Sequence, residues 1–218
     1  MARAPTRTPR LNPDDFAGAL AVGNKYKKGI ATRDRVLAEA IDLFHAKGYT
    51  NASIRQLITK IGKSSSVIYN HFADKEDILF MIMRRTGEKT LGLLAEVKQR
   101  HPGDPEGGLR AMIRAMLHLV EHPSMVKEIA IFQNEAYHLP KRRRAIINRQ
   151  YLGIVHAFEE AVAAFLRARK RKGASVTVAA FNILATINWF YLWYRPKGPL
   201  AVDAIADEIT GFIFHGLA

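Results

Sequence analysis

The chain has 218 residues, enough for one or two domains with a substantial core, and it contains no cysteine. Disulfide-stapled folds and thiolate metal sites are therefore excluded. The formal net charge of +13 predicts an anionic partner such as nucleic acid, acidic lipid or an anionic small molecule. Residues 1–89 carry +7 and residues 90–218 carry +6, so both halves need a reason for their basicity.

The first 28 residues predict a basic, flexible arm. Pro5, Pro9 and Pro13 disfavour a helix at its start, and the arm carries six Lys or Arg residues. No apolar leader opens the chain, so we expect a cytoplasmic protein. Two roles stay open for the arm: a solvated tail, or a segment that contacts phosphates or the minor groove beside a DNA-binding helix.

A first firm helix is predicted from about Thr32 to Lys47, because apolar residues recur there at helical spacing and Gly48 follows as a stop. A short second helix is predicted next, with apolar residues spaced at i, i+3, i+4 and i+7. This apolar stripe consists of Ile54, Leu57, Ile58 and Ile61. Ser53 and Gln56 have capping-box spacing at the start of the helix.

A third short helix follows a turn at Gly62, a residue suited to the left-handed conformation. Ser64 is expected to cap this helix, and Ile68 and Phe72 form its buried i, i+4 pair. Two short helices joined by a glycine-containing turn are typical of a helix-turn-helix, whose second helix enters the major groove of DNA. An ordinary pair of amphipathic helices in a bundle is the alternative.

Several spaced residues around these helices form one pattern. They are Gly48, Tyr49, Ile54, Arg55, Ser64, Ile68, Tyr69, Phe72, Lys75, Glu76 and Leu79. Together they make residues 33–83 resemble the DNA-binding domain of TetR-family transcriptional repressors. Ala52, Lys63 and Asn70 depart from the usual pattern, and the last two leave the operator sequence open but not the fold. The resemblance implies an all-α protein with an N-terminal three-helix helix-turn-helix domain and a helical ligand-binding and dimerisation domain.

The resemblance also implies which residues contact DNA. Base contacts are expected from Arg55, Ser65, Ser66, Val67 and Tyr69. Phosphate contacts are expected from Ser53, His71 and Lys75, and Ser64 and Asn70 complete the predicted set. The chemistry fits, because arginine pairs with guanine, valine meets a thymine methyl group, and serine donates to or accepts from base edges. Tyr69 has a structural alternative, which is stacking on the helix at 32–47.

A long helix is predicted from Lys75 to about Arg100, with Asp74 as its N-cap. This helix bridges the two halves of the protein, so its rotation would move the recognition helix. The cation of Lys75 opposes the helix dipole in the first turn, so we expect it to have a separate partner, such as a phosphate.

Residues 76–218 are predicted to form the ligand-binding and dimerisation domain, after the arm at 1–28 and the helix-turn-helix domain at 29–75. Its further helices are expected at about 106–121, 124–139, 140–172, 175–195 and 202–215, which makes about nine helices in the chain. Residues 176–194 carry no charge over nearly membrane-spanning length, but their Asn and Thr residues favour a core and an interface over a membrane anchor. The resemblance implies that the last two helices form a four-helix dimer interface with a second copy.

Residues 188–199 resemble the corresponding segment in a branch of TetR regulators that respond to acyl-CoA thioesters. The expected acyl-binding residues are Phe132, Tyr137, Tyr151 and Trp189. The expected phosphate-binding residues are Arg142, Arg143 and Arg144. Packing in the core or interface is the alternative for the aromatic residues, and a solvated basic face is the alternative for the arginines.

The sequence contains no complete enzyme motif. Residues 61–64 resemble the end of a phosphate-binding loop, but Leu57 stands where the first glycine is required. His118 and His122 lie four residues apart without the HExxH motif of zinc proteases. We therefore expect no catalytic residue, no metal and no cofactor.

These features together predict a homodimeric transcriptional repressor that binds palindromic double-stranded operator DNA. A small-molecule inducer, an acyl-CoA thioester, is expected to release it, and no membrane partner is expected. Two alternatives stay open. One is a ligand-binding helical protein with only non-specific nucleic-acid contact, and the other is a repressor induced by a neutral hydrophobic effector.

Overall fold

The computed structural model describes residues 13–62, 64–195 and 197–217, and within these ranges it contains helices and no strand. In chain order the elements are α1 (Pro13–Asn51), α2 (Ile54–Ile61), α3 (Ser65–Tyr69), α4 (Lys75–Arg100), α5 (Pro105–His118), the 3₁₀ turn η1 (Leu119–Glu121), α6 (Pro123–Asn134), the 3₁₀ turn η2 (Ala136–His138), α7 (Lys141–Ala168), α8 (Val176–Trp193) and α9 (Val202–Leu217). The predicted all-α fold is confirmed.

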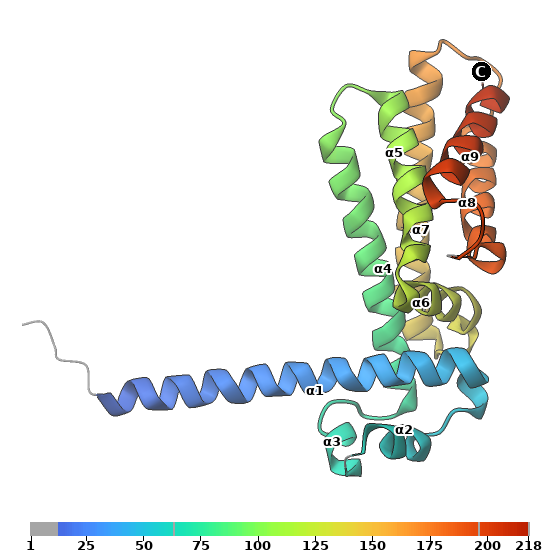
Figure 1. The fold of residues 1–218 in the computed structure, drawn as a ribbon. Helices are drawn as coiled ribbons and strands as arrows, with labels where there is room; N and C mark the ends of the chain where they lie inside the picture. Colours follow the sequence, from blue (N-terminus) through green and yellow to red (C-terminus); the bar gives the residue numbers. More distant parts are fainter. Residues whose placement is uncertain (1–12, 63, 196, 218) are drawn as a thin grey trace, which may run out of the picture.

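Helix α1 begins much earlier than predicted, at Pro13 and not near Thr32 (Figure 1). Proline fits the first turn of a helix, and the residues that follow it include several strong helix formers. The part of the predicted flexible arm that the structure describes, residues 13–28, is therefore helical, whereas residues 1–12 lie outside the described chain. Gly48 ends the regular helix as predicted, with φ 75° and ψ 155°.

Two hydrophobic cores organise the molecule, and α4 belongs to both. The first core joins α1, α2 and α3 to the N-terminal half of α4, including Ile78 and Met83. The second core joins the C-terminal half of α4, including Leu94 and Val97, to α5, α7, α8 and α9. Figure 1 shows α2 and α3 on one side of α1 and the helices α5 to α9 on the other. One continuous helix thus connects the helix-turn-helix with the larger bundle.

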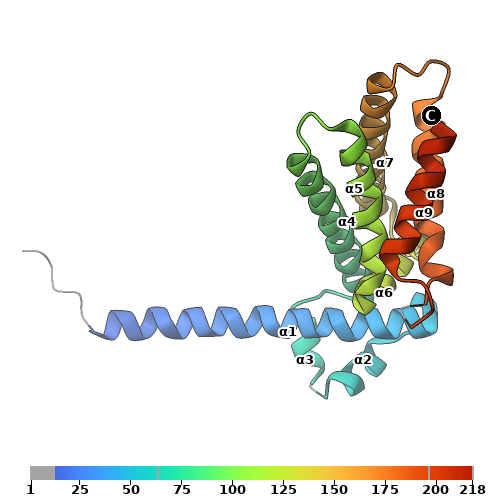
Figure 2. The ribbon, with the colours of Figure 1, turned by 45° about the horizontal axis from the view of Figure 1, so that its top comes forward.

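Helices α8 and α9 lie next to each other along one edge of the bundle (Figures 1 and 2). Helix α8 buries Ala180, Ile183, Leu184, Ile187 and Phe190 in the second core. Its opposite face exposes the large apolar residues Val178, Phe181, Trp189 and Leu192, and α9 exposes Phe212 at 82%. Among the described helices, α8 is long and apolar enough to cross a membrane, and 33% of this span is buried inside the protein. An exposed apolar stripe of this kind needs a partner surface.

Helices α4 and α7 approach closely at Gly87. A methyl group built on Gly87 would lie 2.5 Å from Gln150 Oε1, whereas one on Gly92 of the same helix would meet nothing within 4 Å. Gln150 Nε2 donates a hydrogen bond to Arg84 O at 3.1 Å, so a displaced Gln150 would lose this contact.

We predict opposite effects for alanine at these two glycines. Gly92→Ala should raise the free energy of unfolding by up to about 1 kcal/mol, because alanine is the better helix former. Gly87→Ala should fall short of that gain or destabilise the protein, because the new methyl group displaces Gln150. Urea unfolding followed by circular dichroism compares the two variants. Equal stabilisation by both would contradict the close α4–α7 contact.

Candidate DNA-binding surface and ligand cavity

The helix-turn-helix forms as its local sequence predicts. Gln56 N–H donates to Ser53 Oγ at 3.2 Å, and Ser53 N–H donates to Gln56 Oε1 at 3.0 Å, so the capping box is complete. Gly62 ends α2 in the left-handed conformation with φ 67°. Leu57, Ile61, Ile68 and Phe72 are buried against α1 and α4 in the first core. These contacts fix α3 on the outer side of the domain.

Most of the predicted DNA-binding residues lie on the outer surface of α2 and α3. Ser53, Arg55, Ser64, Ser65, Ser66, Tyr69 and Asn70 are exposed, and Val67 and His71 are half-buried. Tyr69 is 55% exposed and has no ring partner within the described residues, so it does not stack on α1. Arg55 likewise forms no side-chain hydrogen bond or ion pair in the part of the chain that the structure describes. These side chains are free to meet a ligand from solvent.

Ser64 and Lys75 differ from the prediction. Ser64 precedes α3, but its Oγ lies 2.8 Å from Ser66 Oγ and does not cap the helix. Lys75 Nζ donates to Tyr49 O and Ala52 O, both at 2.8 Å, and burial lowers the pKa of this amine. Lys75 therefore has an internal partner at the negative end of α1, where we expected a phosphate. Asp74 caps α4 as predicted, accepting from Asp77 N–H at 2.7 Å.

A small cavity of about 50 Å³ lies in the larger domain. It is lined by Thr86, Gly87, Thr90, Met116, Leu119, Val120, Ile129, Phe132, Gln133, Tyr151, Ile154, Leu184, Ile187, Asn188 and Tyr191. These residues come from α4, α5, η1, α6, α7 and α8. None of the described lining residues is charged. The cavity therefore suits an uncharged, largely apolar group, with hydrogen-bonding side chains of Gln133, Asn188 and the two tyrosines in its wall.

Only part of the predicted ligand set reaches this cavity. Phe132 and Tyr151 line it, whereas Tyr137 and Trp189 are each 66% exposed and lie outside it. Trp189 points away because α8 turns its inner face toward the core through Ile187 and Tyr191. Asn188 and Tyr191 fall in the segment that the sequence singled out, but α8 is apolar all round, so its periodicity did not show which residues face inward.

The arginine cluster at the start of α7 does not line the cavity. Arg143 Nη1 donates to Glu76 Oε1 at 3.0 Å, and its Nη2 donates to Asp77 Oδ1 at 2.9 Å. Its guanidinium also covers the ring of Phe80 at 5.1 Å. Arg143 thus fastens α7 to the first turn of α4. Arg142 is exposed and Arg144 half-buried, and neither forms an ion pair among the residues described.

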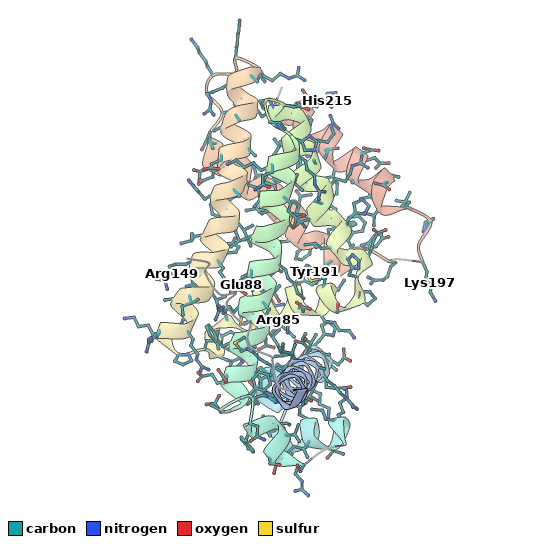
Figure 3. All side chains as sticks on the ribbon, turned by 90° about the vertical axis from the view of Figure 1, so that its left-hand side faces the viewer. Arg85, Glu88, Arg149, Tyr191, Lys197 and His215 are labelled. Carbon is teal, nitrogen blue, oxygen red and sulfur yellow. The ribbon has the colours of Figure 1, made fainter. Side chains whose placement is uncertain are left out.

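An ion pair with a buried carboxylate, which we did not predict, lies behind the cavity wall. Glu128 of α6 is only 5% exposed, and its Oε2 accepts from Lys89 Nζ at 2.8 Å and lies 3.1 Å from Thr86 Oγ1. Two further pairs connect the same helices to α1: Arg85 with Asp34 at 2.7 Å and Lys127 with Asp42 at 2.6 Å. Arg85 lies where α4 passes α1 (Figure 3). Helices α1, α4 and α6 are therefore joined beside the cavity. These partners are too far apart in sequence for a local pattern to predict.

His118, one of the two histidines considered as a metal pair, contacts two carboxylates. His118 Nδ1 lies 2.6 Å from Glu121 Oε2 and its Nε2 lies 3.0 Å from Asp203 Oδ1. Burial alone would lower the pKa of His118, but hydrogen bonds to these two carboxylates outweigh it and raise the pKa. Within residues 13–62, 64–195 and 197–217, no group of three or more acidic or histidine side chains is arranged to hold a metal ion.

Comparisons with known proteins match both halves of the chain. Residues 36–82 match the family model described as bacterial regulatory proteins of the tetR family, and residues 102–217 match the tetracyclin repressor-like C-terminal domain. The transcriptional repressor KstR2 of Rhodococcus jostii is 27% identical over 192 residues, 85% of this chain and 91% of the relative. The transcriptional activator FasR of Mycolicibacterium smegmatis is 28% identical over 210 residues, 93% and 90% of the two chains.

One solved structure with a similar fold contains both a ligand and DNA. The crystal structure of AibR in complex with isovaleryl coenzyme A and operator DNA superimposes with a TM-score of 0.75. It is 28% identical to this chain and covers 84% of it and 98% of AibR.

Proposed function

Because the chain belongs to the TetR family of bacterial regulatory proteins, we propose that it is a homodimeric repressor that an acyl-CoA thioester releases from a palindromic operator. Family membership also confirms that the chain is a transcriptional regulator and not an enzyme. The observation that carries the proposal is one helix, α4, shared by the core under the recognition surface and the core around an uncharged cavity. Such a regulator acts on DNA in the cytoplasm.

The recognition surface has the chemistry needed to read the major groove. Helix α3 presents small hydroxyl side chains and Tyr69, which suit base edges, and Arg55 of α2 is free for a bidentate contact to guanine. Two such helices must enter successive major grooves about 34–36 Å apart, so a dimer on a palindrome follows from the function.

Helices α8 and α9 support such a dimer. Phe212 projects beside a shallow groove between the two helices, lined by Ala179, Asn182, Ile183, Thr186, Ile213 and Gly216. In a two-fold assembly this groove can receive an aromatic side chain from the second copy. This contact would cover the exposed apolar stripe of α8. The apolar character of α8, which would also fit a membrane, is then explained by a protein interface.

The effector class follows from the cavity and from the solved relative. Its uncharged lining suits an acyl group, for which the cavity of about 50 Å³ would have to widen, and the charged nucleotide of CoA would lie outside its mouth. The AibR complex contains a CoA thioester, which supports a thioester as the effector class for this chain; because the same complex contains operator DNA, it supports the ligand and not its release of DNA. With Arg143 engaged by α4, the phosphates would need the remaining cations of the cluster, the exposed Arg142 and the half-buried Arg144. A neutral hydrophobic effector is the alternative that the same uncharged lining favours.

Arg55→Ala should weaken binding to the operator and relax its specificity at one base pair, by about 1–3 kcal/mol, if Arg55 reads a guanine. Tyr69→Ala should weaken operator binding as well. Arg167→Ala is the matched control, because this exposed arginine at the far end of α7 removes the same charge away from DNA. Fluorescence anisotropy with operator and scrambled duplexes measures these effects. Wild-type affinity in both helix-turn-helix variants would reject this surface.

Phe212→Glu should give monomers or aggregates, because it places a carboxylate in the apolar contact between copies. Leu152→Glu on α7 is the control, since Leu152 is also exposed but lies outside α8 and α9. Sedimentation velocity at low micromolar concentration should show a dimer for the wild type and for the control. A monodisperse wild-type monomer would exclude the proposed assembly.

An acyl-CoA should bind the protein and release it from the operator. CoA alone and the matching free acid should bind and release it only weakly. The acyl group alone lacks the phosphate contacts, and CoA alone leaves the cavity empty. Arg142→Gln with Arg144→Gln should weaken thioester binding more than acid binding. Calorimetry with an acyl-CoA series makes the comparison. Equal binding of acid and thioester, or binding of neither, would end the CoA proposal and leave the repressor assignment standing.

A further inference from the structure

The ring of Tyr49 lies at the joint between the helix-turn-helix and the rest of the molecule. The amine of Lys75 lies 4.1 Å from the centre of this ring, a cation–π geometry. Phe44 of α1 meets the ring edge-on at 5.4 Å, and the His138 ring lies 4.8 Å away. Tyr49 therefore contacts α1, η2 and the start of α4 together.

The amine of Lys75 is occupied by the backbone around this ring. It donates to Tyr49 O and Ala52 O, each at 2.8 Å, and points toward Thr50 O at 3.5 Å. An ammonium group has three N–H donors, so these carbonyl oxygens use its capacity. The carbonyls belong to the end of α1 after Gly48 and to Ala52, which links α1 to α2, whereas Lys75 starts α4, shortly after the recognition helix. One side chain thus closes the chain segment that contains α2 and α3.

The other side of Tyr49 connects to the helix that lines the ligand cavity. Tyr49 N–H donates to Glu135 Oε1 at 3.3 Å, and Glu135 pairs with His138 at 3.2 Å. Both residues follow α6, whose Phe132 and Gln133 line the cavity. The contacts of Tyr49 therefore run from the end of α6 to the first residue of α4.

We propose that Lys75 is a positioning residue for DNA recognition, which acts through Tyr49 and not through a phosphate contact. By holding the α1–α2 turn and the Tyr49 ring against the start of α4, it sets the place of α3 relative to α6. This inference rests on the proposed function as an operator-binding regulator. It also reverses the role expected for Lys75 from the sequence.

The test measures operator affinity against salt concentration for full-length protein with Lys75→Met, Tyr49→Leu and both substitutions together. Methionine keeps the length of lysine without its charge, and leucine removes the ring face. Each single variant should lose about tenfold in affinity, with the wild-type slope of log K against log salt. The double variant should lose little more than either, because the two residues act as one unit.

A phosphate contact has a different signature. Removing it would reduce the salt slope by about 0.9 per subunit, and Tyr49→Leu would leave affinity unchanged. That result would overturn the positioning role. Tyr49→Phe is the matched control, because it keeps the ring and the carbonyl and should bind like wild type.

Lys75→Arg provides a second variant in case Lys75→Met unfolds, which circular dichroism melts would show. Arginine keeps the charge, but its planar fork cannot place its donors on these carbonyls as an ammonium does. It should therefore lose affinity, and wild-type affinity would overturn the proposal. Failure of the wild-type protein to bind any operator would reject the proposed function itself, whereas a reduced slope with intact wild-type binding rejects only the positioning role.

Discussion

Helix α4 is buried in two hydrophobic cores at once, and this constraint shapes the rest of the structure. Ile78 and Met83 pack under the recognition surface, whereas Leu94 and Val97 pack in the larger bundle. The cavity wall at Thr86 and Thr90 lies between these two ends of one helix. Packed cores deform poorly. A ligand that displaces this wall would therefore move one core relative to the other. We propose that the fold converts a local change at the cavity into a change in the direction of the recognition helix.

Ion pairs and cation–π contacts decide how the two parts are joined. Arg143 fastens α7 to the first turn of α4, and Lys89 with Glu128 fastens α6 to the middle of α4. Lys75 closes the α1–α2 turn onto the start of the same helix. Several basic side chains near this joint therefore have partners inside the protein. Exposed pairs of this kind contribute little stability each, but the Glu128 carboxylate is buried and depends on its lysine.

Local patterns predicted local structure well. The Ser53–Gln56 capping box and the left-handed Gly62 depend on residues within a few positions, so the helix-turn-helix and its exposed face were predictable. The internal partners of Lys75 and Arg143 were not predicted because they lie more than 20 residues away in the chain. Trp189 was misplaced because α8 is apolar on all sides, so its sequence does not mark an inner face. The start of α1 was missed because three prolines outweighed the helix formers that follow Pro13.

In the proposed dimer, ligand in the cavity changes the separation of the two recognition surfaces. The chain has no cysteine, so Thr59→Cys at an exposed position of α2 gives one site for a thiol-reactive spin label per subunit. Pulsed electron paramagnetic resonance then measures the label-to-label distance with operator DNA and with isovaleryl-CoA. We expect one distance on DNA and a different distance, shifted by several ångströms, with a thioester that releases the operator. Release of DNA by the thioester with an unchanged distance would contradict it.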